Sequence, residues 1–193
     1  MPSCEAVTSR PPRGFSFIEL LVVVAVSGIM MSVVLPRLRI SESTEVQLAG
    51  MQLAQDIDLA RTRALSTRSR ARVKFTTTSA VGYAGYLDVD GDSAFAESAD
   101  EITGLRGFGT RALPVRILFG RGNAIALPNF AGSGAVTFSS NRLEFDARGL
   151  PTPMGTAGVA YLAHERDPNA VTAIAVSSSG GVRIWTWKAG LWK

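Results

Sequence analysis

An unbroken apolar run near the N-terminus constrains this chain more than any other feature of its sequence. The run extends from Phe15 to Leu35, and Glu19 is the only charged residue within it. As an α-helix, these 21 residues would be about 30 Å long, which matches the hydrocarbon core of a bilayer. A carboxylate is costly to bury in such a helix, so Glu19 indicates a function and a positively charged partner.

The residues around this carboxylate form a pattern. Arg13-Gly14-Phe15 comes directly before the run, and Glu19 lies four residues after Phe15. This Gly-Phe-x-x-x-Glu pattern resembles the class III signal of type IV prepilins and type II secretion pseudopilins. The resemblance implies that a prepilin peptidase cuts between Gly14 and Phe15, that Phe15 is then N-methylated, and that Glu19 serves filament assembly. An ordinary signal anchor is the alternative, but it gives no reason for Glu19.

The resemblance also divides the chain into three segments. Residues 1–14 would be a leader peptide that is removed, residues 15–40 a transmembrane and assembly helix, and residues 41–193 a periplasmic globular domain. Pro36 ends the apolar run, and proline removes a helical hydrogen bond. We therefore expect at Pro36 either a helix break, as in many pilins, or the point where the helix leaves the membrane.

Groups that commonly carry chemistry are scarce in this sequence. Its single cysteine, Cys4, lies in the predicted leader, so the mature chain can form no disulfide. A single histidine, His164, cannot build a usual zinc site, and no phosphate loop or nucleophile–base set is present. The net charge of +4 permits an anionic partner without requiring one. We expect no enzymatic activity, no cofactor and no metal.

Small and apolar residues at steps of three and four predict an amphipathic helix from Ser43 to about Arg68. The stripe consists of Val46, Ala49, Gly50, Leu53, Ile57, Ala60 and Ala64. Small residues on such a stripe suit close packing against a sheet. The segment from Leu53 to Val73 also resembles the FimT/GspH group of minor pilins and pseudopilins.

A dense basic run lies where this helix ends. Its members are Arg61, Arg63, Arg68, Arg70, Arg72 and Lys74. Cations are favoured near a helix C-terminus by the helix dipole, so we interpret the run as a solvated helix end. Contact with nucleic acid or with an acidic subunit is the alternative.

The pattern changes to alternation after Ala71, which predicts short strands separated by turns. The expected strands are residues 72–76, 83–89, 115–119, 135–139, 142–145, 159–163, 170–176 and 182–188. Together with the helices they predict an α+β, pilin-like fold. In this fold a long N-terminal helix, half in the membrane and half amphipathic, packs against antiparallel β-structure in one sheet or two.

Asp88, Asp90 and Asp92 follow one of these strands and suggest a calcium loop. An EF-hand would need glycine and glutamate where Ser93 and Ala99 stand, so that type of site is excluded. We interpret the three residues as a solvated acidic turn. An irregular calcium site stays open as an alternative.

Two further polar residues are expected in structural roles. Asp146 lies in Phe145-Asp146-Ala147-Arg148-Gly149, which resembles the Phe-Asp-x-x-Gly turn of the FimT/GspH group, and we expect it to cap this turn through its side chain. His164 has no obvious base or nucleophile beside it in the sequence, so we expect it on the surface or in a turn.

The predicted last strand carries the candidate ligand-binding residues. Alternation places Arg183, Trp185 and Trp187 on one face and Lys188 on the other. DNA-binding minor pilins of the FimT kind have Gly-Arg-x-Arg near this point, whereas residues 180–183 read Gly-Gly-Val-Arg and lack the first arginine. Arg183 and Lys188 are candidates to pair with phosphates, and Trp185 and Trp187 to stack on bases. Alternatively, the tryptophans cover the sheet or contact a neighbouring subunit.

The sequence favours a GspH-like minor pseudopilin of type II secretion, which helps start or cap the pseudopilus. The alternative is a FimT-like minor type IV pilin that binds DNA during natural transformation. Both resemblances imply a single-pass protein of the bacterial inner membrane, with prepilin peptidase and other pilins or pseudopilins as partners.

The signal predicts where the mature chain begins. Intact-mass analysis of the protein from membranes of its host should give the mass of residues 15–193 plus one methyl group. The same protein from cells without the peptidase should keep residues 1–14. A mature chain that still begins at Met1, without a methyl group, would contradict the prediction.

Overall fold

A computed structural model describes residues 15–34, 41–92, 95, 109–130 and 132–193. The chain forms two compact units, residues 1–40 and residues 41–193, and each is described by itself. Gly14 and Pro36 lie outside the described residues, so the predicted cleavage and helix break at these positions stay predictions.

The described part of the first unit, residues 15–34, forms one helix, α1 (Phe17–Val34). Its only acidic residue is Glu19, in the first turn, and every side chain described from Phe15 to Ser32 is exposed. Among the residues with described placement, no helix combines the length and apolarity that a membrane crossing requires.

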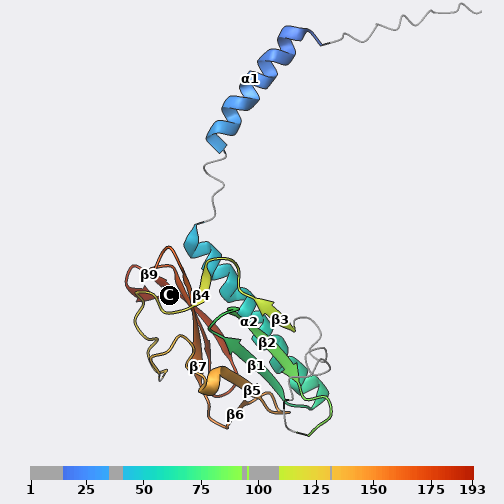
Figure 1. Ribbon diagram of the computed structural model, residues 1–193, viewed down its shortest axis with the longest axis vertical. Coiled ribbons are helices and arrows are strands. Elements are labelled where there is room, and N and C mark those ends of the chain that lie inside the picture. Colours follow the sequence, from blue (N-terminus) through green and yellow to red (C-terminus); the bar gives the residue numbers. More distant parts are fainter. Residues whose placement is uncertain (1–14, 35–40, 93–94, 96–108, 131) are drawn as a thin grey trace, which may run out of the picture. The chain divides into compact units, whose positions relative to one another are not determined.

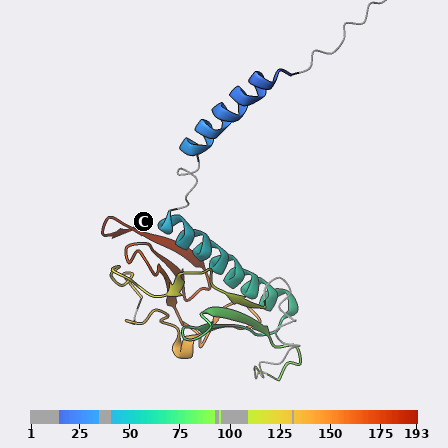
Figure 2. The same cartoon turned by 45° about the horizontal axis from the view of Figure 1, so that its top comes forward.

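The second unit combines one long helix with two five-stranded antiparallel sheets (Figures 1 and 2). The helix is α2 (Glu42–Thr67). The first sheet has the order β3-β2-β1-β5-β6, with β1 (Ala71–Thr76), β2 (Gly82–Leu87), β3 (Thr110–Ala112), β5 (Arg142–Phe145) and β6 (Pro151–Thr152). The second has the order β10-β9-β8-β7-β4, with β4 (Ile117–Phe119), β7 (Gly158–His164), β8 (Val171–Val176), β9 (Val182–Lys188) and β10 (Leu191–Trp192). A short 3-10 turn, η2 (Ser139–Asn141), precedes β5.

Helix α2 contacts strands of both sheets, which confirms the α+β prediction of a helix packed on antiparallel sheets. All seven residues of the predicted stripe are buried, and Leu53 and Ile57 are fully buried. A side chain at Gly50 would begin 2.6 Å from Cγ2 of Thr172 on β8, so the glycine lets the helix approach this strand closely. Small residues on the stripe therefore set the distance between helix and sheet.

Most predicted strands are present, but the one expected at residues 135–139 is not. Val136 makes only an isolated bridge to Ala160, and the backbone N–H of Thr137 donates to the carbonyl of Val159. The chain then turns through Ser140 and Asn141, both of which have positive φ angles. The alternation in the sequence is real, because Val136 and Phe138 are buried, but the ladder ends after a single bridge.

Two other predicted strands are shorter than expected. The strand predicted at residues 115–119 begins only at Ile117, because Arg116 before it has a φ of 70°. The strand predicted to reach Val89 ends at Leu87, and all six residues of β2 are buried instead of alternating. Strands β3, β6 and β10 were not predicted from the sequence, because they have only two or three residues each.

The packing of α2 predicts that two leucines of this helix contribute very differently to the free energy of unfolding. Leu53→Ala should lower the free energy of unfolding by about 2–5 kcal/mol, because Leu53 is 0% exposed in the core. Leu48→Ala should change it by less than about 1 kcal/mol, because Leu48 is 54% exposed. Urea denaturation of residues 41–193, which hold the whole core, measures both, and equal losses would contradict this packing.

Candidate functional site

The N-terminal end of α1 presents the residues of the predicted signal. Phe15 is 80% exposed, and the carbonyl of Ser16 accepts hydrogen bonds from the N–H groups of Glu19 and Leu20. Glu19 thus lies in the first helical turn, where the helix dipole favours a carboxylate. The helix is apolar on all sides, and a helix of this kind needs lipid or other helices around it.

On the second unit, a groove of about 770 Å³ lies beside β9. One wall is the loop of residues 125–130, and the floor includes Arg183, Trp185 and Trp192. Two hydrogen bonds hold the loop in place. The hydroxyl of Tyr161 accepts from the N–H of Leu127 at 2.8 Å, and the indole Nε1 of Trp192 donates to the carbonyl of Ile125 at 3.1 Å.

The predicted faces of β9 are correct. Trp185 packs with Ala173 and Ala175 on the groove side of the second sheet, while Val182 and Ile184 lie toward α2. Trp187 is only 9% exposed and meets Trp192 edge to face, with ring centroids 5.2 Å apart.

These positions separate the candidate DNA-binding residues into two groups. Arg183 and Lys188 are exposed, on opposite faces of β9, so both are available to anions. Trp187 is buried against its neighbours and offers no free ring face for stacking, as the alternative interpretation of a tryptophan that covers the sheet expected. Trp185 is half-buried and lines the groove.

Three arginines of the basic run contact other elements of the fold. The guanidinium of Arg61 donates from Nε to the carbonyl of Gly149 at 3.0 Å and from Nη2 to the carbonyl of Ser179 at 3.3 Å. Arg70 and Arg72 both pair with Glu144 at 2.8 Å. The interpretation of a wholly solvated helix end is therefore wrong for these three arginines, which tie α2 and β1 to other elements.

A buried polar cluster that the sequence did not predict joins α2 to the first sheet. The hydroxyl of Tyr83 donates to Asp56 at 2.6 Å, and Arg111 pairs with the same carboxylate oxygen at 2.8 Å. Burial raises the pKa of Asp56, against the effects of Tyr83 and Arg111, which lower it. Burial also raises the pKa of Tyr83, and the Asp56 carboxylate adds to this rise. The spacing held a signal, because Asp56 lies three residues after Leu53 and four before Ala60, on the buried stripe.

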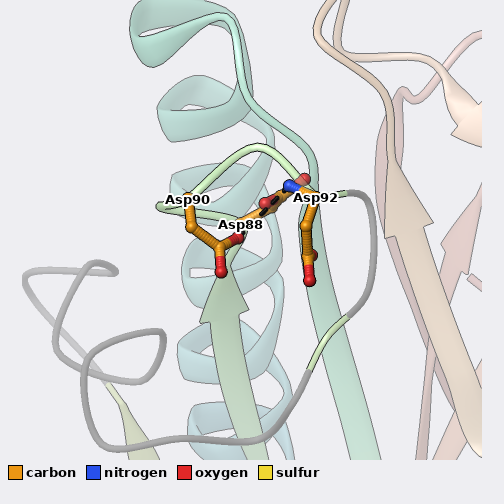
Figure 3. A group of neighbouring side chains, drawn as sticks. All are labelled: Asp88, Asp90 and Asp92. Atoms are coloured by element: carbon orange, nitrogen blue, oxygen red, sulfur yellow. Dashed lines mark hydrogen bonds between the residues drawn. The ribbon is translucent and has the colours of Figure 1, made fainter.

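Asp88, Asp90 and Asp92 come together after β2, with carboxylate oxygens that lie within 4.8 Å of one another (Figure 3). Asp88 accepts a hydrogen bond from the N–H of Gly91, and Asp90 accepts one from the N–H of Asp92. These bonds are those of an acidic turn, as predicted, and Asp90 and Asp92 are exposed. The expectation that the whole turn is solvated is wrong for Asp88, which is 3% exposed. Carboxylate oxygens are also the ligands that Ca²⁺ prefers, so the open alternative would use these three residues.

The predictions for Asp146 and His164 had different outcomes. Asp146 accepts hydrogen bonds from the N–H groups of Arg148 and Leu150, which confirms its turn role. Partial burial acts to raise the pKa of Asp146, but the hydrogen bonds from Leu150 and Arg148 stabilise the ionised carboxylate more strongly. The pKa of Asp146 is therefore lowered. The surface position expected for His164 is wrong. Its side chain is 2% exposed, and its Nε2 lies 3.6 Å from Glu45 of α2, because α2 covers the end of β7.

Comparison with known proteins bears on the N-terminal segment. Residues 9–35 match the family model of the prokaryotic N-terminal methylation motif, and this range includes Gly14, Phe15 and Glu19. The N-terminal segment therefore carries the prokaryotic N-terminal methylation motif. The sequence prediction of a prepilin-type N-terminal signal is thereby confirmed, while the family model covers only this N-terminal part of the chain.

Two solved structures align with about three quarters of the chain. Both are crystal structures of the type IV minor pilin FimU from Pseudomonas aeruginosa, in two crystal forms. They share 17% and 14% sequence identity with the chain and cover 78% and 76% of it, which corresponds to 93% and 96% of their own length. The TM-scores are 0.46 and 0.45. No curated protein matches the chain in sequence.

The buried cluster predicts a pH-dependent effect of Tyr83→Phe. Loss of the hydroxyl leaves Asp56 with one hydrogen bond fewer, so we expect the free energy of unfolding to fall by about 1–3 kcal/mol at neutral pH. The hydroxyl stabilises the ionised carboxylate, so its removal should raise the pKa of Asp56 further. The loss of stability should therefore grow as the pH rises above the already raised pKa that Asp56 has in the wild-type protein.

Urea denaturation at several pH values measures this loss, and Asp56→Asn supplies the control. In the Asp56→Asn background, Tyr83→Phe should show no change in its effect between acid and neutral pH, because no carboxylate remains to titrate. A loss that is the same at every pH in the wild-type background would contradict the assigned role of Asp56.

Proposed function

We propose that this protein is a non-enzymatic subunit of a type IV pilus-like filament, and that α1 is its assembly element. The observation that carries the proposal is the exposure of α1. A helix with apolar side chains exposed on all sides is stable only where lipid or other helices cover it. Before assembly, residues 15–35 would be held in the bacterial inner membrane with residues 41–193 in the periplasm. After assembly, the stems of other pilins or pseudopilins would replace the lipid.

Glu19 would make the replacement of lipid by other pilin stems specific. An unpaired carboxylate in apolar surroundings is strongly unfavourable, so it needs a cation within the filament. Cleavage after Gly14 would create a positively charged amine at Phe15, and this amine on a neighbouring subunit is the proposed partner of Glu19. Prepilin peptidase would thus act before assembly, because the partner charge exists only after cleavage.

Within this class we propose a GspH-like minor pseudopilin of type II secretion, which takes part in starting or capping the pseudopilus. The incomplete Gly180–Arg183 turn and the burial of Trp187 support this choice over DNA binding. The alternative proposal is a FimT-like minor type IV pilin for natural transformation. The exposure of Arg183 and Lys188 favours it, because phosphates would need cations that are accessible.

The proposed pairing predicts a separation between processing and assembly. Glu19→Ala should be cleaved and retained in the membrane at wild-type levels, but its amount in sheared filaments should fall at least about tenfold, because a buried amine would lose its partner. Glu42→Ala, which removes an exposed carboxylate from the start of α2, serves as the control and should assemble normally. Normal assembly of Glu19→Ala would contradict the proposal.

A further inference from the structure

The second sheet has an edge that is only partly covered. Strand β10 pairs with β9 at Trp187 and Lys188, and the chain then makes two hydrogen bonds between Lys193 and Thr186. Hydrogen-bonding residues alternate along an antiparallel ladder, so the next outward N–H and C=O groups belong to Ile184 and then to Val182. Among the described residues, no strand pairs with β9 on this side from Val182 to Trp185.

A hollow lies on each face of this open edge. On one face is the groove floored by Arg183 and Trp185, and on the other is a smaller hollow of about 320 Å³ between β9 and α2. Exposed apolar side chains border both hollows. They include Leu191 at 64%, Ile125 at 62%, Met51 at 38% and Ile184 at 36% exposure. Open edges with apolar surroundings are places where an added strand can pair.

We propose that this edge binds an extended segment of another protein chain, which adds to the second sheet antiparallel to β9, beyond Lys193. Such a strand would pair its backbone with Ile184 and Val182. Its side chains would alternate between the two faces, so that successive residues would fill first one hollow and then the other.

The exposed charge of Arg183 indicates the composition of the segment that would pair with β9. The residue opposite Arg183 lies on the groove face, and an acidic side chain there would pair with the exposed guanidinium. The residue opposite Trp185 would enter the apolar part of the groove, and the residue opposite Ile184 would lie toward Met51. Read from its N-terminus, the segment would be apolar, apolar, acidic, apolar.

A second copy of this chain fits less well. If two copies paired through their open edges, Val182 of each would lie opposite Ile184 of the other, and the two Arg183 side chains would face each other. Like charges directly opposite are destabilising. A register shifted by one step would bring Val182 opposite Thr186, whose outward groups already bond to Lys193.

The test uses the full-length chain in detergent micelles and the probe acetyl-Leu-Val-Asp-Val-Thr-amide with a C-terminal fluorophore, followed by fluorescence anisotropy. In the proposed register, the first valine lies opposite Ile184 and the aspartate opposite Arg183. N-methylation of the first valine removes an amide that faces β9 and should weaken binding about tenfold. N-methylation of the aspartate alters an amide that faces away and should change binding less than about twofold.

A second arm tests the charge. Replacing the probe's aspartate by lysine should weaken binding about tenfold, and Arg183→Glu should reverse this preference. Arg166→Glu, which makes the same charge change at an exposed site in the β7–β8 turn, should leave it unaltered. Because β9 lies in the second unit, the result does not depend on whether Glu19 acts in assembly.

Three outcomes would overturn the inference. The first is the absence of saturable binding by any of the probes. The second is an equal loss of affinity for both N-methylated probes, which would indicate a groove ligand rather than an added strand. The third is a duplex oligonucleotide that binds with dependence on Arg183 while the peptide probes do not, which would assign the surface to nucleic acid.

Discussion

The contact of α2 with two sheets at once is the interaction on which the globular unit depends. The two sheets are separate hydrogen-bonded ladders, so the helix stripe provides much of the apolar surface on which both assemble. Leu53 and Ile57 supply the buried volume, while Gly50 allows the approach of β8. Arg61 then fixes loops of both sheets to the same helix through Gly149 and Ser179. Helix and sheets therefore form one cooperative core.

The two units use apolar surface in opposite ways. In α2 the apolar residues occupy a stripe that the sheets bury, whereas in α1 they occur on every side and are exposed. In the proposed function, lipid or other helices cover α1. This difference between the two helices is what the proposed function depends on. Helix α2 stabilises the globular unit, and α1 is the proposed assembly element.

The sequence predicted much of this structure, wherever a repeating pattern faced a core. The helix stripe and the faces of β9 follow from periodicity alone, and the turn at Asp146 follows from local side-chain chemistry. What the sequence did not predict depends on contacts between distant residues. His164 is buried because α2 crosses the end of β7, and Arg111 meets Asp56 although 55 positions separate them. The loop of residues 125–130 has no period, so the groove that it walls could not be foreseen.

The short pairing of β10 has a practical consequence for any fusion to this protein. A purification tag joined after Lys193 would start beside the uncovered backbone of Ile184 and could occupy it as an extension of the sheet. Such a fusion protein would look well folded and yet have its edge blocked by its own added residues. A tag inserted at the exposed Asp90–Asp92 turn would leave that edge untouched.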